Sequence, residues 1–166
     1  MLRISLFLLL CPLLAAADAV APLLYPVTKV NITNRGSLLS ARDEIQRAVD
    51  GFDKMDIKAL RTNRSYATIG TVYTYHAMLL PESDIDARIH AYERALALRK
   101  DPDSIYNLAT CYKRKYNDAV AKGDMSNEVA FGKKIYHELD MFLKISPSAG
   151  RKVAERRDYF RIYLNY

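Results

Sequence analysis

From residue 40 onward, apolar side chains recur at every third or fourth position, which is the period of one face of an α-helix. The first positions with this spacing are Ile45, Val49, Phe52 and Met55. They follow Ser40-Ala41-Arg42-Asp43, which resembles a capping box with Asp in place of Glu or Gln. The pattern therefore predicts an amphipathic helix that begins at Ser40.

Further helices follow, separated by short breaks rich in Pro, Gly, Asp and Ser. The predicted ranges are 66–80, 85–100, 105–122, 126–145 and 152–164. Residues 66–80 are rich in Val, Ile, Thr and Tyr, which also suit a strand. Their length and their helical neighbours favour a helix instead. Because short connections favour antiparallel neighbours, the sequence predicts an all-α fold.

The N-terminus has the three parts of a secretory signal peptide. Arg3 supplies a positive start, residues 4–17 are apolar apart from Ser5, and Ala17-Asp18-Ala19 is a small-x-small cleavage site. We expect residues 1–19 to be removed, with cleavage after Ala17 as a second choice. The alternative is an uncleaved membrane anchor, which would have to include Asp18 at a cost in lipid. Lipidation at Cys11 is disfavoured, since Leu residues precede it.

The segment 20–39 contains Pro22 and Pro26 and shows no helical period, so we expect an extended or disordered leader. The remainder, 40–166, is predicted to form one helical domain. Half of the residues are hydrophobic and only six are Gly and six Pro, which excludes collagen-like and low-complexity classes. Two Cys exclude a disulfide scaffold.

Two stretches carry the pattern of a helical repeat. Tyr66-x2-Ile69-Gly70-x2-Tyr73 and Ile105-x2-Leu108-Ala109-x2-Tyr112 match the first half of the tetratricopeptide pattern, with Tyr or Ile in place of Trp. Residues 65–102 and 103–148 therefore resemble two tetratricopeptide repeats, capped by the helix from Ser40 and by a helix within 150–164. The resemblance implies a short right-handed solenoid of helical hairpins with six to seven helices. It also implies core-facing positions for five tyrosines: Tyr66, Tyr73, Tyr92, Tyr112 and Tyr136.

In this family a partner occupies the groove lined by the first helix of each repeat. The resemblance implies a groove made of Arg64, Thr71, Thr74, Tyr106, Asn107, Thr110, Lys113 and Arg114. Such a groove would be basic and polar, so the expected partner is a protein or an acidic or carboxylate-ended peptide. The expected function is that of a secreted or periplasmic binding protein.

The net charge of +6 agrees with an acidic partner. Half of this excess lies in the segment 151–166, whose basic helix suits an anionic membrane surface. The second alternative is therefore a membrane-associated adaptor anchored by an uncleaved N-terminus. Arginines there alternate with aromatic residues, a pattern that also occurs in nucleic-acid binding. Nucleic acid is nevertheless disfavoured as a partner for an exported protein.

Catalytic and metal-binding signals are weak. His76, His90 and His137 lack the spacing of a metal site, so we predict no catalytic residue, no metal and no cofactor. Cys111 lies in an apolar helical stretch and is expected to be a small buried hydrophobe. The rival hypothesis is a small exported enzyme or toxin that uses Cys111 or a His.

Acidic side chains are expected at helix starts or on solvated faces, among them Asp84, Asp86, Glu128 and Glu138. In a eukaryotic host, Asn31 and Asn63 would be glycosylation acceptors.

Overall fold

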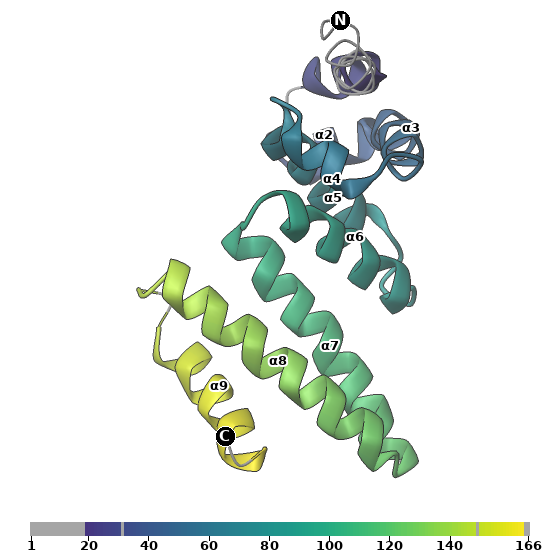
Figure 1. Ribbon diagram of the computed structural model, residues 1–166. Coiled ribbons are helices and arrows are strands. Elements are labelled where there is room, and N and C mark those ends of the chain that lie inside the picture. Colours follow the sequence, from purple (N-terminus) through teal and green to yellow (C-terminus); the bar gives the residue numbers. More distant parts are fainter. Residues whose placement is uncertain (1–18, 31, 149, 165–166) are drawn as a thin grey trace, which may run out of the picture. The chain divides into compact units, whose positions relative to one another are not determined.

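The computed structural model describes residues 19–30, 32–148 and 150–164, and these residues contain helices, turns and loops but no strand (Figure 1). The all-α class predicted from the sequence is therefore confirmed. The chain divides into two compact units. The first runs to Leu79 and includes Ala97–Arg99, and the second holds Leu80–Leu96 and the chain from Lys100. Residues 1–18 of the signal peptide predicted for 1–19, and the sequon at Asn31, lie outside the described residues.

The first unit contains short helices around one apolar core. Its helices are α2 (Arg35–Ser40), α3 (Arg42–Phe52), α4 (Ile57–Thr62) and α5 (Tyr66–Leu79), preceded by a helical segment at 19–28. Helices α2, α3 and α4 all contact α5. Phe52 and Tyr73 are fully buried with ring centroids 6.2 Å apart, and the Tyr73 hydroxyl donates to Asp53 Oδ1 over 2.7 Å. The buried ring of Tyr73 thus keeps its polar end satisfied.

The extended leader predicted for 20–39 is wrong over most of its length, since residues 19–28 are helical and α2 follows. Val20, Leu24 and Val27 are buried along one face of the segment 19–28. Leu23 fits against Gly51 of α3, where an added Cβ would come within 2.5 Å of Leu23 Cδ1. The prolines misled the prediction, since Pro22 and Pro26 both lie within the helical segment 19–28, and Gly51 provides the space for its packing.

The predicted capping box at Ser40 is also wrong. The box is formed by Asn34 and Ser37 at the start of α2, where Asn34 Oδ1 accepts from the Ser37 backbone N–H over 3.0 Å. Ala41 precedes α3 without a side-chain cap. The apolar face predicted for this helix is correct, since Ile45, Val49 and Phe52 are buried.

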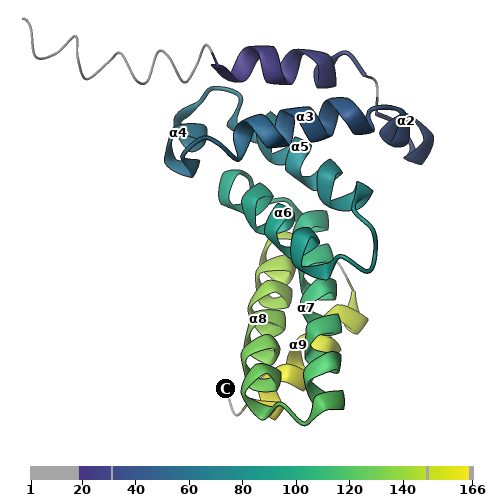
Figure 2. The same ribbon diagram turned by 90° about the vertical axis from the view of Figure 1, so that its right-hand side faces the viewer.

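The second unit is built on a long hairpin. Helices α7 (Pro102–Lys122) and α8 (Met125–Ile145) run side by side in both views (Figures 1 and 2). They are joined by Gly123 and Asp124. Gly123 adopts a left-handed φ of 68°, which suits glycine at a helix end, and Asp124 caps α8 by accepting from the Asn127 backbone N–H. These local signals explain why the sequence located the turn correctly.

Two further helices complete this unit. Residues 85–96 of α6 (Ile85–Leu98) contact α7, where the Tyr112 hydroxyl donates to Glu93 Oε1 over 2.6 Å. Helix α9 (Arg151–Tyr163) packs along α8. Its Phe160 is buried and lies beside Gly132 of α8, where a Cβ would lie 3.6 Å from Phe160 Cδ1. All five helices predicted between 66 and 164 are confirmed to within three residues at each end.

The finer prediction of tetratricopeptide repeats is not confirmed. Counting the segment 19–28, nine helices occupy the described residues instead of six to seven. Helices α7 and α8 have 21 residues each, so their hairpin alone exceeds the roughly 34-residue repeat. Of the five tyrosines placed in the core, Tyr73, Tyr92 and Tyr112 are buried, whereas Tyr66 is 45% exposed. Tyr66 is the first residue of α5.

Candidate functional site

A concave site lies within the second unit, between α7, α8 and α9. It is a pocket of about 340 Å³, near the lower end of the roughly 300–1,000 Å³ range of small-molecule sites. Its lining residues are Tyr106, Ala109, Thr110, Lys113, Ile135, Leu139, Arg156, Tyr159 and Phe160. Those on α7 recur at helical spacing, so one face of α7 forms one side of the pocket.

The interior of the pocket is apolar. Ala109, Ile135, Leu139 and Phe160 are all at least 96% buried. Tyr159 closes another side, with its ring perpendicular to that of Phe160 at a centroid distance of 5.1 Å. These side chains interlock three helices and favour a ligand with an apolar body.

Two cationic side chains, those of Lys113 and Arg156, lie at the solvent-exposed rim of the pocket. Lys113 and Arg156 both line the pocket and are exposed. Lys113 Nζ lies over the rings of Tyr116 and Phe160, 4.4 and 5.4 Å from their centroids. Arg156 Nη1 donates to the Tyr106 hydroxyl oxygen over 3.1 Å. Partial burial, and to a smaller degree the charge of Arg156, lower the pKa of Lys113.

No carboxylate among the described residues forms an ion pair with Lys113 or Arg156. Their contacts are aromatic rings and a neutral hydroxyl. Two neighbouring positive charges without a counter-charge attract an anion. The site therefore combines an apolar interior with an unmatched positive rim.

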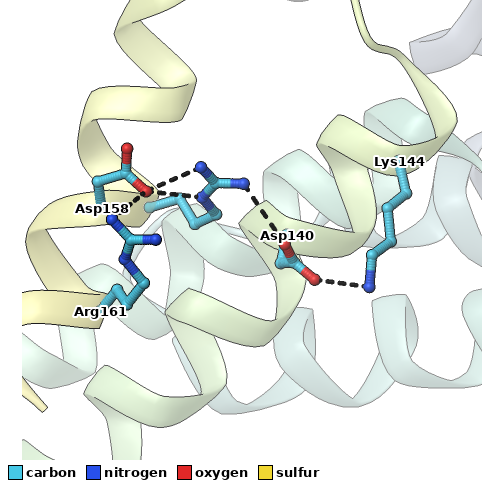
Figure 3. Close-up of polar contacts among 5 residues, drawn as sticks. Asp140, Lys144, Asp158 and Arg161 are labelled. Atoms are coloured by element: carbon cyan, nitrogen blue, oxygen red, sulfur yellow. Dashed lines mark hydrogen bonds and ion pairs between the residues drawn. The ribbon is translucent and has the colours of Figure 1, made fainter. Parts of the chain in front are cut away.

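An ion-pair network fastens α9 to α8 and so fixes one wall of the pocket (Figure 3). The guanidinium of Arg157 lies 3.5 Å from Asp140 Oδ1 on α8 and 2.8 Å from Asp158 Oδ1 on its own helix. Lys144 and Arg161 extend the network at its two ends. The hydrogen bond from Lys144, and then the charges of Lys144 and Arg157, lower the pKa of Asp140. Arg157 is thus paired with Asp140 and Asp158, whereas the adjacent Arg156 lines the pocket.

The structure brings together only part of the groove predicted from the sequence. Tyr106, Thr110 and Lys113 line the pocket. Asn107 and Arg114 are on the same helix but do not line it, and Arg114 donates instead to the backbone carbonyl and to Oε2 of Glu82.

The other three predicted residues, Arg64, Thr71 and Thr74, belong to the first unit. The Thr71 hydroxyl donates to the Ala67 carbonyl and accepts from Arg99 Nη1. The Thr74 hydroxyl donates to the Gly70 carbonyl. Both hydroxyls thus have contacts within their own unit.

Sequence reasoning missed the contributions of α8 and α9. Ile135 and Leu139 have no signal of their own, because buried aliphatic residues occur throughout helices. Arg156 and Tyr159 did carry one, since arginines alternate with aromatic residues there. The pattern predicts an amphipathic helix docked on the solenoid with its charges in water, whereas the structure turns Arg156 as well as Tyr159 and Phe160 towards one pocket.

Other candidate chemistry finds little support. Cys111 is 4% exposed and carries no disulfide, and burial raises the pKa of its thiol, which disfavours the reactive thiolate. The described residues contain no group of three His, Cys, Asp or Glu side chains that could hold a metal ion. Within the same residues, no helix combines the length and apolar character needed to cross a bilayer.

Comparison with known proteins gives no further guide, since no family model, curated protein or solved structure matches the chain.

Proposed function

We propose that this chain is a non-catalytic binding protein that holds an acidic partner at the pocket between α7, α8 and α9. The observation that carries the proposal is the pair Lys113 and Arg156, two cations at one apolar pocket with no carboxylate among the described residues to neutralise them. An acidic ligand would supply the missing charge and bury an apolar group beside it.

The proposal keeps the binding function and the acidic peptide or protein partner expected from the sequence. It places the contact on one helical hairpin and its docked helix rather than along a repeat groove. A right-handed, tetratricopeptide-like stacking of the hairpins belongs to the same proposal, as do the signal peptide at 1–19 and a secreted or periplasmic location. The small buried residues Gly70, Ala95 and Ala109 support close helix packing.

Charge reversal at the rim tests this function. We expect Lys113→Glu and Arg156→Glu to weaken the binding of fluorescein-labelled acidic peptides at least about tenfold, because each replaces an attraction by a repulsion. Fluorescence anisotropy against a panel of such peptides measures the effect. Lys133→Glu is the matched control, since Lys133 is an exposed lysine of α8 outside the pocket. An equal loss of peptide affinity in all three variants would show that binding depends on net charge alone and would refute the proposal.

A further inference from the structure

The polar groups of the pocket are few, and most already have contacts. The Thr110 hydroxyl donates to the Tyr106 backbone carbonyl over 3.0 Å. The Tyr106 hydroxyl accepts from Arg156 and can still donate its own proton. The other lining side chains, apart from the two cations and the Tyr159 hydroxyl, are aliphatic or aromatic. A peptide backbone inside this pocket would find few acceptors for its N–H groups, and each unpaired N–H costs about 1–3 kcal/mol.

A ligand without amide groups avoids this cost. The interior suits an unbranched or aromatic hydrocarbon body, and the rim suits a single anionic head. A guanidinium can bind a carboxylate through two parallel hydrogen bonds, and a lysine ammonium can add a third. The volume of about 340 Å³ is small, so it favours one chain of medium length over a two-chain lipid.

We infer that the pocket binds a free monocarboxylate with an apolar chain, such as a medium-chain fatty acid, its chain among Ala109, Leu139 and Phe160 and its head between Lys113 and Arg156. This inference rests on the proposed function and specifies the ligand of the same site. In both, an anionic group lies beside Lys113 and Arg156, and the inference places a hydrocarbon chain without a peptide backbone in the apolar interior.

Binding would also remove a repulsion within the protein. Lys113 and Arg156 are neighbouring like charges, and burial already penalises the charged form of Lys113. An anion between them compensates both effects, so the pKa of Lys113 rises when the ligand binds. A neutral ligand of the same length provides no such compensation, and a cationic one adds to the repulsion. Ligands of one chain length should therefore differ in affinity according to the charge of their head group.

Isothermal titration calorimetry of the full chain with decanoate, decanol and decylammonium, each below its aggregation concentration, tests the inference. We expect decanoate to bind one equivalent, decanol at least about tenfold more weakly, and decylammonium not at all. Arg156→Gln and Lys113→Gln should each weaken decanoate about tenfold, whereas the matched control Lys133→Gln should bind as the wild type does. Circular dichroism melts of each variant verify that the fold is retained.

The outcomes separate this inference from the proposed function. Equal affinity for decanoate and decanol, or no binding of either, overturns the inference, and the comparison on the wild-type protein holds even if a variant fails to fold. If acidic peptides still bind and depend on Lys113 and Arg156, the proposed function stands without the amphiphile. If peptides and decanoate both fail, the proposed function fails as well.

Discussion

Glu138 illustrates how neighbours change the chemistry of one side chain. The sequence placed it on a solvated face of α8, but it is partly buried and its Oε2 atom has no hydrogen-bond partner. Burial, and then the charge of Glu93 on α6, raise the pKa of Glu138 to about 7, while Lys134 opposes the shift. Glu93 itself is held by the hydroxyl of Tyr112. The charge of Glu93 thus raises the pKa of Glu138 more than the charge of Lys134 lowers it.

This raised pKa makes stability depend on pH. The folded state binds a proton at Glu138 up to about pH 7, whereas an unfolded Glu releases it near pH 4.3. The free energy of unfolding should therefore fall as the pH rises from about 5 to about 7.5 and then level off. Glu138→Gln should flatten this decline and be the more stable protein at pH 8. Urea unfolding at pH 5 and pH 8 measures both differences.

Asp118→Asn is the control for this change, because Asp118 is an exposed carboxylate of α7. It should retain the wild-type decline. If Glu138→Gln shows the same decline as the wild type, Glu138 titrates as an ordinary exposed acid and the interpretation is wrong.

Helix α9 packs against a glycine of its neighbour α8. Ideal Cβ placement at Gly132 gives distances of 3.4 Å to Leu164 Cδ2 and 3.6 Å to Phe160 Cδ1. A methyl group fits at these distances, but a longer side chain does not. Since Phe160 lines the pocket, the contact between α8 and α9 controls the shape of the site as well as the stability of the unit.

Gly132→Leu should therefore destabilise the chain by about 1–3 kcal/mol through overpacking. It should also accelerate hydrogen exchange in α9 and weaken ligand binding at the pocket, because Phe160 is displaced. Hydrogen exchange with mass spectrometry, together with urea unfolding, measures these effects. Gly132→Ala is the matched control and should be neutral or stabilising by up to about 1 kcal/mol, owing to the helix propensity of Ala. An α9 that exchanges equally slowly in the Leu variant would contradict the packing argument.

Taken as a molecule, the chain joins a predicted export signal to two helical units. Residues 19–28 contribute Val20, Leu24 and Val27 to the core of the first unit. Cleavage after Ala19 would keep this helical face, whereas cleavage further along would remove core residues. The packing of the first unit is thus compatible with the site predicted from the small-x-small pattern.

We propose that signal peptidase cleaves after the small residue Ala19, so that the mature protein begins at Val20. Intact-mass and N-terminal peptide mass spectrometry of the protein from its own compartment check this start. Ala19→Leu should slow processing, and Ala16→Leu, just outside the small-x-small motif, is the control. A full-length chain in the membrane fraction would instead support the uncleaved anchor.

Local signals made most helices predictable. Pro81, Asp101-Pro102 and Gly123-Asp124 interrupt the helical period, and Asp101 caps α7 by accepting from the Ser104 backbone N–H. Such signals act within a few residues and are visible in the chain. The helical segment 19–28 was not predicted, because it packs through a contact between residues far apart in the sequence, Leu23 and Gly51.

The pocket was predictable only in part, for the same reason. Tyr106, Thr110 and Lys113 share one face of α7, so their spacing alone indicates a common surface. Arg156 and Phe160 join them because α9 folds back onto α8, where Arg157 pairs with Asp140. Helical periodicity specifies which residues of one helix lie together, and the sequence alone therefore specified the all-α class, most helix bounds and one side of the site. Which helices face each other depends on contacts between residues far apart in the sequence. Only the tertiary structure therefore showed the two sides of the pocket formed by α8 and α9, the unpaired charges of Lys113 and Arg156, and the burial of Glu138.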